Sequence, residues 1–221
     1  MLTIKIEVNT REIALSSSLI PVALSKRNTF KYQFQQAIEN QKKSYARKTV
    51  LHVDELTMRR MIEKYSEQVV YRPIDDMRYY FQYTKRAMTE PGYPPLFYPA
   101  VVDRKRDPNI SAVMAIGEGV AGLVAQKLYQ CRKLARPYKD GVDIVMSTQH
   151  QTYLVEAKGS AAVEENSFVS GKLNDEYLED VSRETLSSSE IDIRLVKGLL
   201  IGVHLKNEIS YNCYITEINI S

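Results

Sequence analysis

The stretch GVDIVMSTQHQTYLVEAK, residues 141–158, contains two short apolar runs separated by a polar link. Residues 142–146 and 152–157 have the length and apolar content of β-strands. We expect the two strands to form a hairpin that turns at residues 149–150. In that register, two residues face each other when their numbers add to 299.

This register places charged side chains together. Asp143 faces Glu156, and Lys158 shares a face with Glu156 because side chains alternate along a strand. Opposed side chains have Cβ atoms about 5 Å apart, which lets two carboxylates share one divalent cation. Oxygen ligands suit Mg²⁺, with Mn²⁺ as a substitute. The set would serve metal-dependent phosphodiester hydrolysis, in which Lys158 positions or deprotonates the attacking water or stabilises charge on the phosphate.

A simpler interpretation of the same residues is structural. Glu156 and Lys158 would form an ion pair at a sheet edge, and Asp143 would be a turn residue after Gly141. Exposed ion pairs of this kind are common and contribute little to stability.

The flanking sequence predicts further elements. Apolar residues recur at helical spacing over 111–134, and a second helix is expected at 175–186. Residues 199–205 and 211–218 have the pattern of strands. Helices and strands that alternate in this way indicate a mixed α/β layer.

The N-terminal half is expected to be mainly helical after an opening strand at 3–8. Helical spacing occurs over 34–45, over 56–69 after a possible cap at Asp54, and over 77–88 after Asp75 or Asp76. The proline-rich residues 91–99 cannot continue a helix and predict a loop.

Asp143, twelve residues and then Glu156-Ala157-Lys158 together resemble the D…(D/E)xK signature of the PD-(D/E)xK nuclease superfamily, the restriction-endonuclease-like proteins. The resemblance covers residues 111–205. It implies that Asp143 and Glu156 are metal ligands, that Lys158 activates water, and that Glu118 on the preceding helix is an auxiliary ligand. Val142 stands where the nominal motif has proline, and 136–139 is only a weak candidate for the first core strand.

The resemblance also implies an architecture and a function. The fold would be α/β, with a mixed central sheet flanked by helices in residues 101–221. The resemblance does not extend to residues 1–100, which we expect to form a mainly helical extension that binds DNA or dimerises. The activity would be Mg²⁺-dependent cleavage of double-stranded DNA, most simply as a type II restriction-type endonuclease. A repair nuclease, junction resolvase or transposon-end nuclease would fit the same fold. Cutting both strands with one site per chain favours a homodimer.

Two other functions remain open at this point. The chain could be a non-catalytic nucleic-acid-binding subunit with the same fold. Gly117-x-Gly119-x-x-Gly122, preceded by residues 112–116 as a strand, also resembles a dinucleotide-binding oxidoreductase motif. Glu118 would then face the pyrophosphate with its negative charge, which disfavours that assignment. The same glycines would equally allow close helix packing without a ligand.

Charge is unevenly distributed over the 221 residues, although the net charge is only +3. Residues 1–163 contain 25 Lys and Arg against 16 Asp and Glu, whereas residues 164–221 contain 5 against 11. A basic body suits a protein that meets phosphate backbones, although a mixed-charge surface would look the same in composition. The candidate phosphate contacts are Arg104, Lys105, Arg106 and Lys139.

Composition also disfavours several classes of protein. Cys131 and Cys213 are too few and too far apart in sequence for a disulfide framework or a zinc site. We expect no membrane span, because no apolar run approaches 18 residues, and no signal peptide. The expected location is therefore the cytoplasm.

Overall fold

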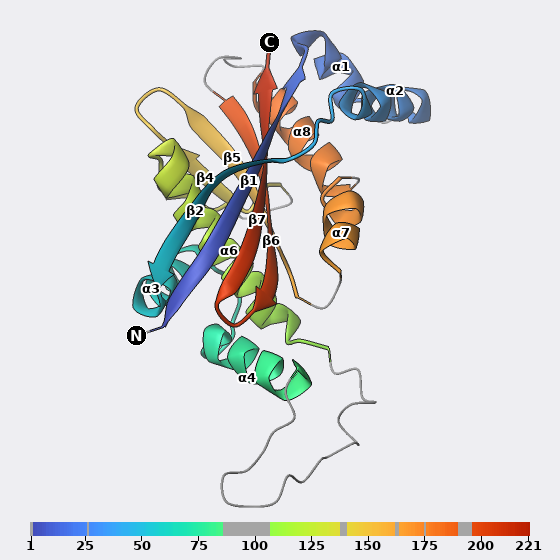
Figure 1. Cartoon of the computed structure of the whole chain (residues 1–221). Coiled ribbons are helices and arrows are strands. Elements are labelled where there is room, and N and C mark those ends of the chain that lie inside the picture. Colours follow the sequence, from blue (N-terminus) through green and yellow to red (C-terminus); the bar gives the residue numbers. More distant parts are fainter. Residues whose placement is uncertain are drawn as a thin grey trace, which may run out of the picture.

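The computed structural model describes residues 2–25, 27–85, 107–137, 141–161, 164–174, 176–189 and 196–221. A seven-stranded mixed sheet in the order β2-β1-β7-β6-β5-β4-β3 forms its centre (Figure 1). The α/β prediction is thus confirmed. The strands are β1 (Thr3–Leu15), β2 (Ala46–Asp54), β3 (Arg132–Ala135), β4 (Ile144–Ser147), β5 (Thr152–Ser160), β6 (Val196–Asn207) and β7 (Ser210–Ile220).

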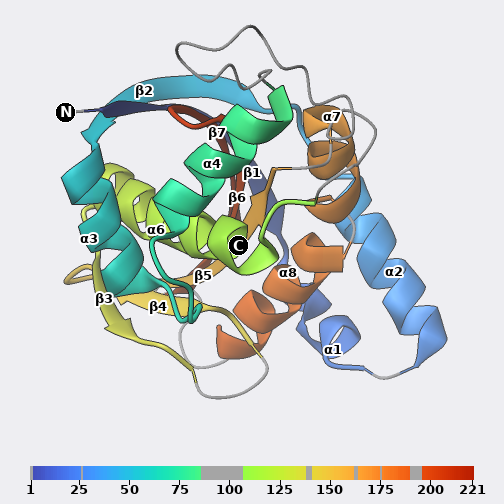
Figure 2. The same ribbon diagram turned by 90° about the horizontal axis from the view of Figure 1, so that it is seen from below.

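Helices cover both faces of the sheet. When the molecule is turned to look along the strands, α3, α4 and α6 lie on one side and α1, α2, α7 and α8 on the other (Figure 2). The helical elements are η1 (Ser17–Leu19), α1 (Ile20–Ala23), α2 (Asn28–Glu39), α3 (Glu55–Tyr65), α4 (Pro73–Lys85), α6 (Ile110–Tyr129), α7 (Glu165–Ser167), η2 (Phe168–Lys172) and α8 (Glu176–Ser188).

Each face has its own hydrophobic cluster. Ile201 of β6 belongs to the cluster with α6, and the neighbouring Leu200 belongs to the cluster with α2 and α8. Successive side chains of a strand point to opposite faces, so a strand covered on both sides needs a nearly continuous apolar run. Such a run is seen in Leu199–Leu205, which the sequence predicted as a strand.

Helix α6 is the central helix of one face. Its glycines permit close approach: a Cβ on Gly119 would lie 2.6 Å from Ile62 Cγ1, and one on Gly122 would overlap the Tyr65 ring of α3. Residues 112–116 are helical, so the strand that the dinucleotide-binding motif requires is not formed. The glycines instead serve helix packing.

The same helix bears on the expectation that the chain has no membrane span. By length and composition alone, Ile110–Tyr129 is apolar enough to cross a membrane. However, 72% of its apolar window is buried inside the protein. Such burial is typical of a core helix and is consistent with a soluble protein.

The predicted β4–β5 hairpin is confirmed in its register. Ile144 pairs with Val155 and Met146 pairs with Tyr153, so the partner numbers add to 299 as expected. The first core strand, β3, pairs with β4 and lies just before residues 136–139, where only a weak candidate was predicted. The sheet therefore brings the start of β4 beside the middle of β5.

The N-terminal half differs most from expectation. β1 extends to Leu15 and pairs with β7 in parallel, while β2 was missed altogether. β2 is an edge strand whose exposed residues include Arg47 and Lys48, so it lacks the apolar alternation of a typical strand. Both strands join the sheet formed by residues 101–221, and one hydrophobic cluster contains Ile4 and Ile201. The described part of residues 1–100 thus completes the sheet rather than forming an extension outside it.

The predicted helices are found with shifted ends. Asp54 caps α3 as expected, with its side chain accepting from the Thr57 N–H, but Val69 lies beyond the helix and is fully exposed. α2 begins and ends earlier than predicted, so Tyr45 lies outside it. α4 begins at Pro73, before the predicted caps, and Met88 lies outside the described residues.

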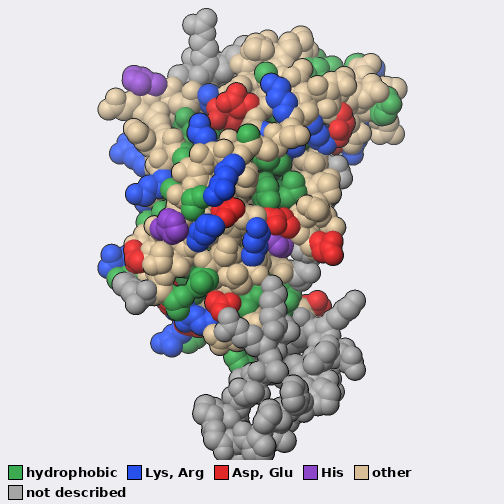
Figure 3. Space-filling view, viewed as in Figure 1, with side chains coloured by type: hydrophobic (Ala, Val, Ile, Leu, Met, Phe, Trp, Pro, Cys, Tyr) green, Lys and Arg blue, Asp and Glu red, His purple; other side chains and the backbone are tan. Residues whose placement is uncertain are grey.

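The surface charge is mixed on the face seen in Figure 3, where Lys and Arg side chains lie beside Asp and Glu side chains. The net charge of the basic part of the chain does not single out this face as a place for an anionic partner.

Candidate catalytic site

Asp143 and Glu156 face each other across the β4–β5 pair. The Asp143 backbone N–H donates to Glu156 Oε2 at 3.2 Å, and the Ala157 N–H donates to Asp143 Oδ2 at 2.8 Å. Each strand thus positions the carboxylate of the other, as the hairpin register predicts. Glu156 is only 9% exposed, and β5 lies between β4 and β6. An ion pair at a sheet edge therefore does not describe this site.

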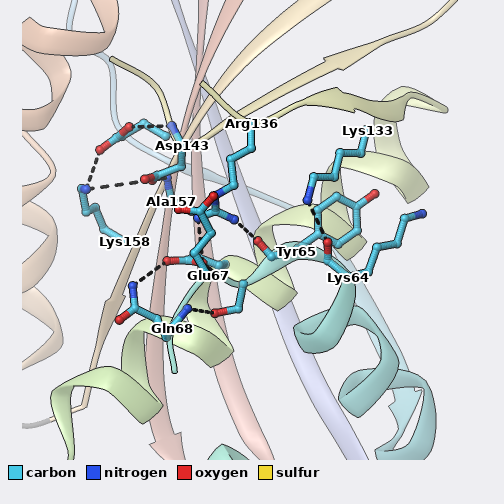
Figure 4. A network of polar contacts seen from close by, with 12 residues as sticks. Lys64, Tyr65, Glu67, Gln68, Lys133, Arg136, Asp143, Ala157 and Lys158 are labelled. Carbon is cyan, nitrogen blue, oxygen red and sulfur yellow. Dashed lines mark hydrogen bonds and ion pairs between the residues drawn. The ribbon is translucent and has the colours of Figure 1, made fainter. Parts of the chain in front are cut away.

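Lys158 lies on the same side of β5, as predicted. Its Nζ is 2.5 Å from Glu156 Oε1 and 4.0 Å from Asp143 Oδ2 (Figure 4). The Nζ also lies 4.6 Å from the ring centroid of Tyr177 in α8. We call Asp143, Glu156 and Lys158 the hairpin triad. One cation serves two carboxylates in this triad.

Burial is the main influence on the acids of the hairpin triad. It raises the pKa of Asp143, opposed by the Ala157 N–H and by Lys158. Burial and the charge of Asp143 together raise the pKa of Glu156. Burial also lowers the pKa of Lys158, but the hydrogen bond and charge of Glu156 and the charge of Asp143 outweigh it, and the net pKa lies above the ordinary value. The lysine is therefore a cation here, and negative charge on the two acids is only partly compensated.

Glu118 of α6 belongs to a neighbouring cluster. This side chain is 2% exposed and accepts hydrogen bonds from the Glu67 N–H (3.0 Å), Gln68 Nε2 (3.2 Å) and Arg136 Nη2 (3.0 Å). Arg136 also lies 2.5 Å from Glu67 Oε1 and donates to the Tyr65 carbonyl oxygen. We call Glu118, Arg136, Glu67 and Gln68 the Glu118 cluster (Figure 4).

Sequence reasoning placed Glu118 near the hairpin but missed its partners. Arg136 could have been noticed as a basic residue just before the hairpin. Glu67 and Gln68 carry no such signal, because the turn after α3 brings them from 50 or more positions away in sequence. The two clusters are electrostatic neighbours, since Glu118 raises the pKa of Asp143 and Arg136 lowers it, both as smaller influences than burial.

The carboxylate oxygens of Asp143 and Glu156 are of the ligand type that Mg²⁺ prefers. Among the described residues, no three Asp, Glu, His or Cys side chains converge on one metal position. Mg²⁺ nevertheless binds through one or two carboxylates, completed by water and substrate phosphates. Asp143 Oδ1 accepts no hydrogen bond from any residue the structure describes, and the negative charge of the hairpin triad favours a cation. Asp143 and Glu156 therefore fit Mg²⁺, whereas the Glu118 oxygens already have partners.

All four predicted phosphate contacts lie outside the described residues, as does the predicted loop at 91–99; the four are Arg104, Lys105, Arg106 and Lys139. The role of these four residues as phosphate contacts and the loop at 91–99 therefore remain predictions.

With the geometry of the site established, the chain was compared with known proteins. No protein-family model matches it, and neither a curated protein nor a solved structure matches it. The assignment of function thus depends on the chemistry of the hairpin triad and its surroundings.

Proposed function

We propose that the protein is a Mg²⁺-dependent endonuclease that hydrolyses phosphodiester bonds in double-stranded DNA, most simply as a type II restriction-type enzyme. The observation that carries the proposal is the hairpin triad. The buried carboxylate of Glu156 and the partly buried carboxylate of Asp143 face each other across the β4–β5 hairpin, and one lysine contacts both within 4.0 Å. Oxygen ligands beside a cation suit a divalent metal and a phosphate.

The order of elements supports the resemblance to PD-(D/E)xK nucleases. That resemblance implies a core of helix, three strands, helix and strand, and the chain has α6, β3, β4, β5, α8 and β6 in sequence. β3, β4 and β5 are antiparallel neighbours, and β6 pairs with β5 in parallel. α6 and α8 cover opposite faces of these strands (Figure 2). The short helical elements α7 and η2 between β5 and α8 lie outside this order.

Asp143 and Glu156 would hold Mg²⁺, which supplies Lewis-acid polarisation of the phosphate and lowers the pKa of the attacking water. Lys158 acts as a protonated donor, because the two carboxylates hold its pKa above the ordinary value. Its ammonium orients the water and stabilises negative charge on the non-bridging phosphate oxygens. In this arrangement it does not start the reaction as a base.

Glu118 contributes indirectly in this arrangement. Its oxygens hold Arg136 and the turn after α3 in place, so the residue supports the wall of the site. Direct or water-mediated metal contact by Glu118 would require its hydrogen bonds with Gln68 or Arg136 to be exchanged. We therefore assign its role as positioning, with auxiliary metal ligation as the extension that the family resemblance suggests.

Each chain contributes one hairpin triad, while cleavage of a duplex requires both strands to be cut. We therefore propose a homodimer in which each protomer cleaves one strand, acting on DNA in the cytoplasm.

The test is cleavage of plasmid and phage DNA of varied sequence in Mg²⁺, in Mn²⁺ or in EDTA. Lys158→Ala should abolish metal-dependent fragments. Lys197→Ala is the matched control, because Lys197 of the adjacent strand β6 has a similar ion pair, with its Nζ 2.8 Å from Glu217. Cleavage that persists in Lys158→Ala, or that is equally lost in Lys197→Ala, would count against the proposal.

A non-catalytic DNA-binding subunit is the second candidate. The observation that favours it is the engagement of Glu118 by Arg136, which leaves only two carboxylates for a metal. This candidate predicts salt-dependent DNA binding by the folded protein, without cleavage in either metal.

A further inference from the structure

Two lysines converge at the end of α3. Lys64 Nζ lies 5.1 Å and Lys133 Nζ lies 5.8 Å from the ring centroid of Tyr65. Lys133 comes from β3, and its Nζ donates to the Lys64 carbonyl oxygen at 2.9 Å. The contact joins positions 69 apart in sequence, so the fold itself brings the Lys133 ammonium to the end of α3.

Lys64 and Lys133 are not neutralised by carboxylates, unlike Arg59 nearby. Neither Lys64 nor Lys133 forms an ion pair with a carboxylate of the described chain. Arg59 of the same helix, by contrast, binds both Glu55 and Asp75. The helix carbonyl and the aromatic ring hold Lys133 in place without neutralising it. Each ammonium group is therefore free to bind a phosphate oxygen without first breaking an ion pair.

A third cation, Arg136, follows the two lysines in the direction of the hairpin triad. Arg136 donates to the Tyr65 carbonyl oxygen, one residue along from the carbonyl that Lys133 binds. β3, which carries Lys133, pairs with β4, and Asp143 directly precedes β4. Figure 4 shows Arg136 and then Lys133 on the side of Tyr65 that leads toward Asp143 and Lys158, and Lys64 beyond Tyr65 at the outer end of the row. The cations thus extend from the candidate catalytic site along one wall.

We propose that Lys64 and Lys133 form a phosphate-binding strip that holds the DNA backbone beside the cleaved bond. This inference rests on the proposed nuclease function and adds a path for the substrate. Ammonium groups suit phosphates as point charges and bind them without regard to base sequence. The strip therefore contributes affinity and orientation, while the sequence that is read depends on other side chains.

The experiment measures binding of fluorescently labelled duplex DNA of random sequence in EDTA, between about 50 and 200 mM salt. Each lost phosphate contact reduces the slope of log affinity against log salt by about 0.9. We expect Lys64→Ala with Lys133→Ala to reduce the slope by about 2. Lys64→Glu, a single exposed change, should weaken binding further than Lys64→Ala. Lys64→Arg with Lys133→Arg should restore the wild-type slope.

Lys31→Ala is the matched control, since Lys31 is an exposed lysine of α2 on the other side of the sheet, and it should leave binding unchanged. A wild-type slope in both the double alanine variant and Lys64→Glu would overturn the strip. If those variants bind normally and the wild type still cleaves DNA in a Lys158-dependent manner, only this inference fails. If the folded wild type neither binds nor cleaves DNA, the proposed function fails with it.

Discussion

The two neighbouring acidic clusters differ in how their carboxylates are compensated. In the Glu118 cluster, one carboxylate meets an arginine and two further donors. In the hairpin triad, two carboxylates share one lysine, and burial raises the pKa of both acids. A fully compensated carboxylate stabilises the fold, whereas a partly compensated pair retains affinity for an added cation. The difference separates a supporting site from a site that binds a ligand.

The largest expected effect breaks the compensated cluster. Arg136→Ala leaves Glu118 charged, buried and without its cation, which should cost about 3–5 kcal/mol of unfolding free energy. Asp143→Asn, in the other cluster, removes a charge that burial already disfavours and should change stability far less. Urea unfolding of the two variants and of the wild type measures both losses of unfolding free energy. Equal losses in the two variants would contradict the comparison.

The next effect concerns metal. Mg²⁺ or Mn²⁺ should stabilise the wild type, by about 2.7 kcal/mol when the free metal is at one hundred times its Kd. Asp143→Asn should lose this stabilisation, because it removes one of two ligands, while Glu118→Gln should keep it. Thermal unfolding with and without metal gives the measurement. Metal stabilisation that depends on Glu118 rather than Asp143 would reverse the assignment of roles.

A smaller effect tests how the Glu118 cluster is held in place. A Cβ at Gly122 would overlap the ring of Tyr65, whose carbonyl oxygen binds Arg136. Gly122→Ala should therefore cost about 1–3 kcal/mol through overpacking. Gly171→Ala is the control, since a Cβ at Gly171 meets nothing within 4 Å. The denaturant midpoint of Gly122→Ala should lie below that of the wild type, whereas the midpoint of Gly171→Ala should stay close to it.

The smallest effect comes from a charged cluster nearer the surface. Glu55 is hydrogen-bonded by Arg59 and Arg78, and the bond from Arg59 is the largest reason that its pKa lies below the ordinary 4.5. A lowered pKa in the folded state adds stability above pH 4.5, which is lost as pH falls through the lower folded value. Glu55→Gln should flatten this acid limb and cost about 1 kcal/mol or less near pH 7. Stability measured across the acid range would show the flattening, and an unchanged limb would count against it.

The hairpin triad could be predicted because its contacts are local. Thirteen positions separate Asp143 from Glu156, and strand alternation with a short turn decides which residues face each other. Strands β5 and β6 were equally recognisable, because both contain apolar runs. Strand β2 could not be recognised, because an exposed edge strand needs no apolar face and its partner β1 lies some forty residues earlier.

For a related reason, the sequence could not predict the environment of Glu118 or the pair Lys64 and Lys133. Their contacts join a helix end to segments 50 to 71 positions away, and no periodicity encodes such a meeting. Local chemistry thus identifies the hairpin triad, while long-range packing decides which of its neighbours are compensated.

The parallel pairing of β1 with β7 has a consequence for folding on the ribosome. Lys5 pairs with Ser210, and the pairing continues to Leu15 with Ile220. One edge of β1 can pair with β2 early in synthesis, but the other edge stays open until β7 emerges from the exit tunnel. An unpaired strand edge of this length is prone to aggregation, and contacts so distant in sequence form slowly. The last strand of the chain therefore closes the edge of the first, and β1 completes its hydrogen bonds only when the C-terminal residues are available.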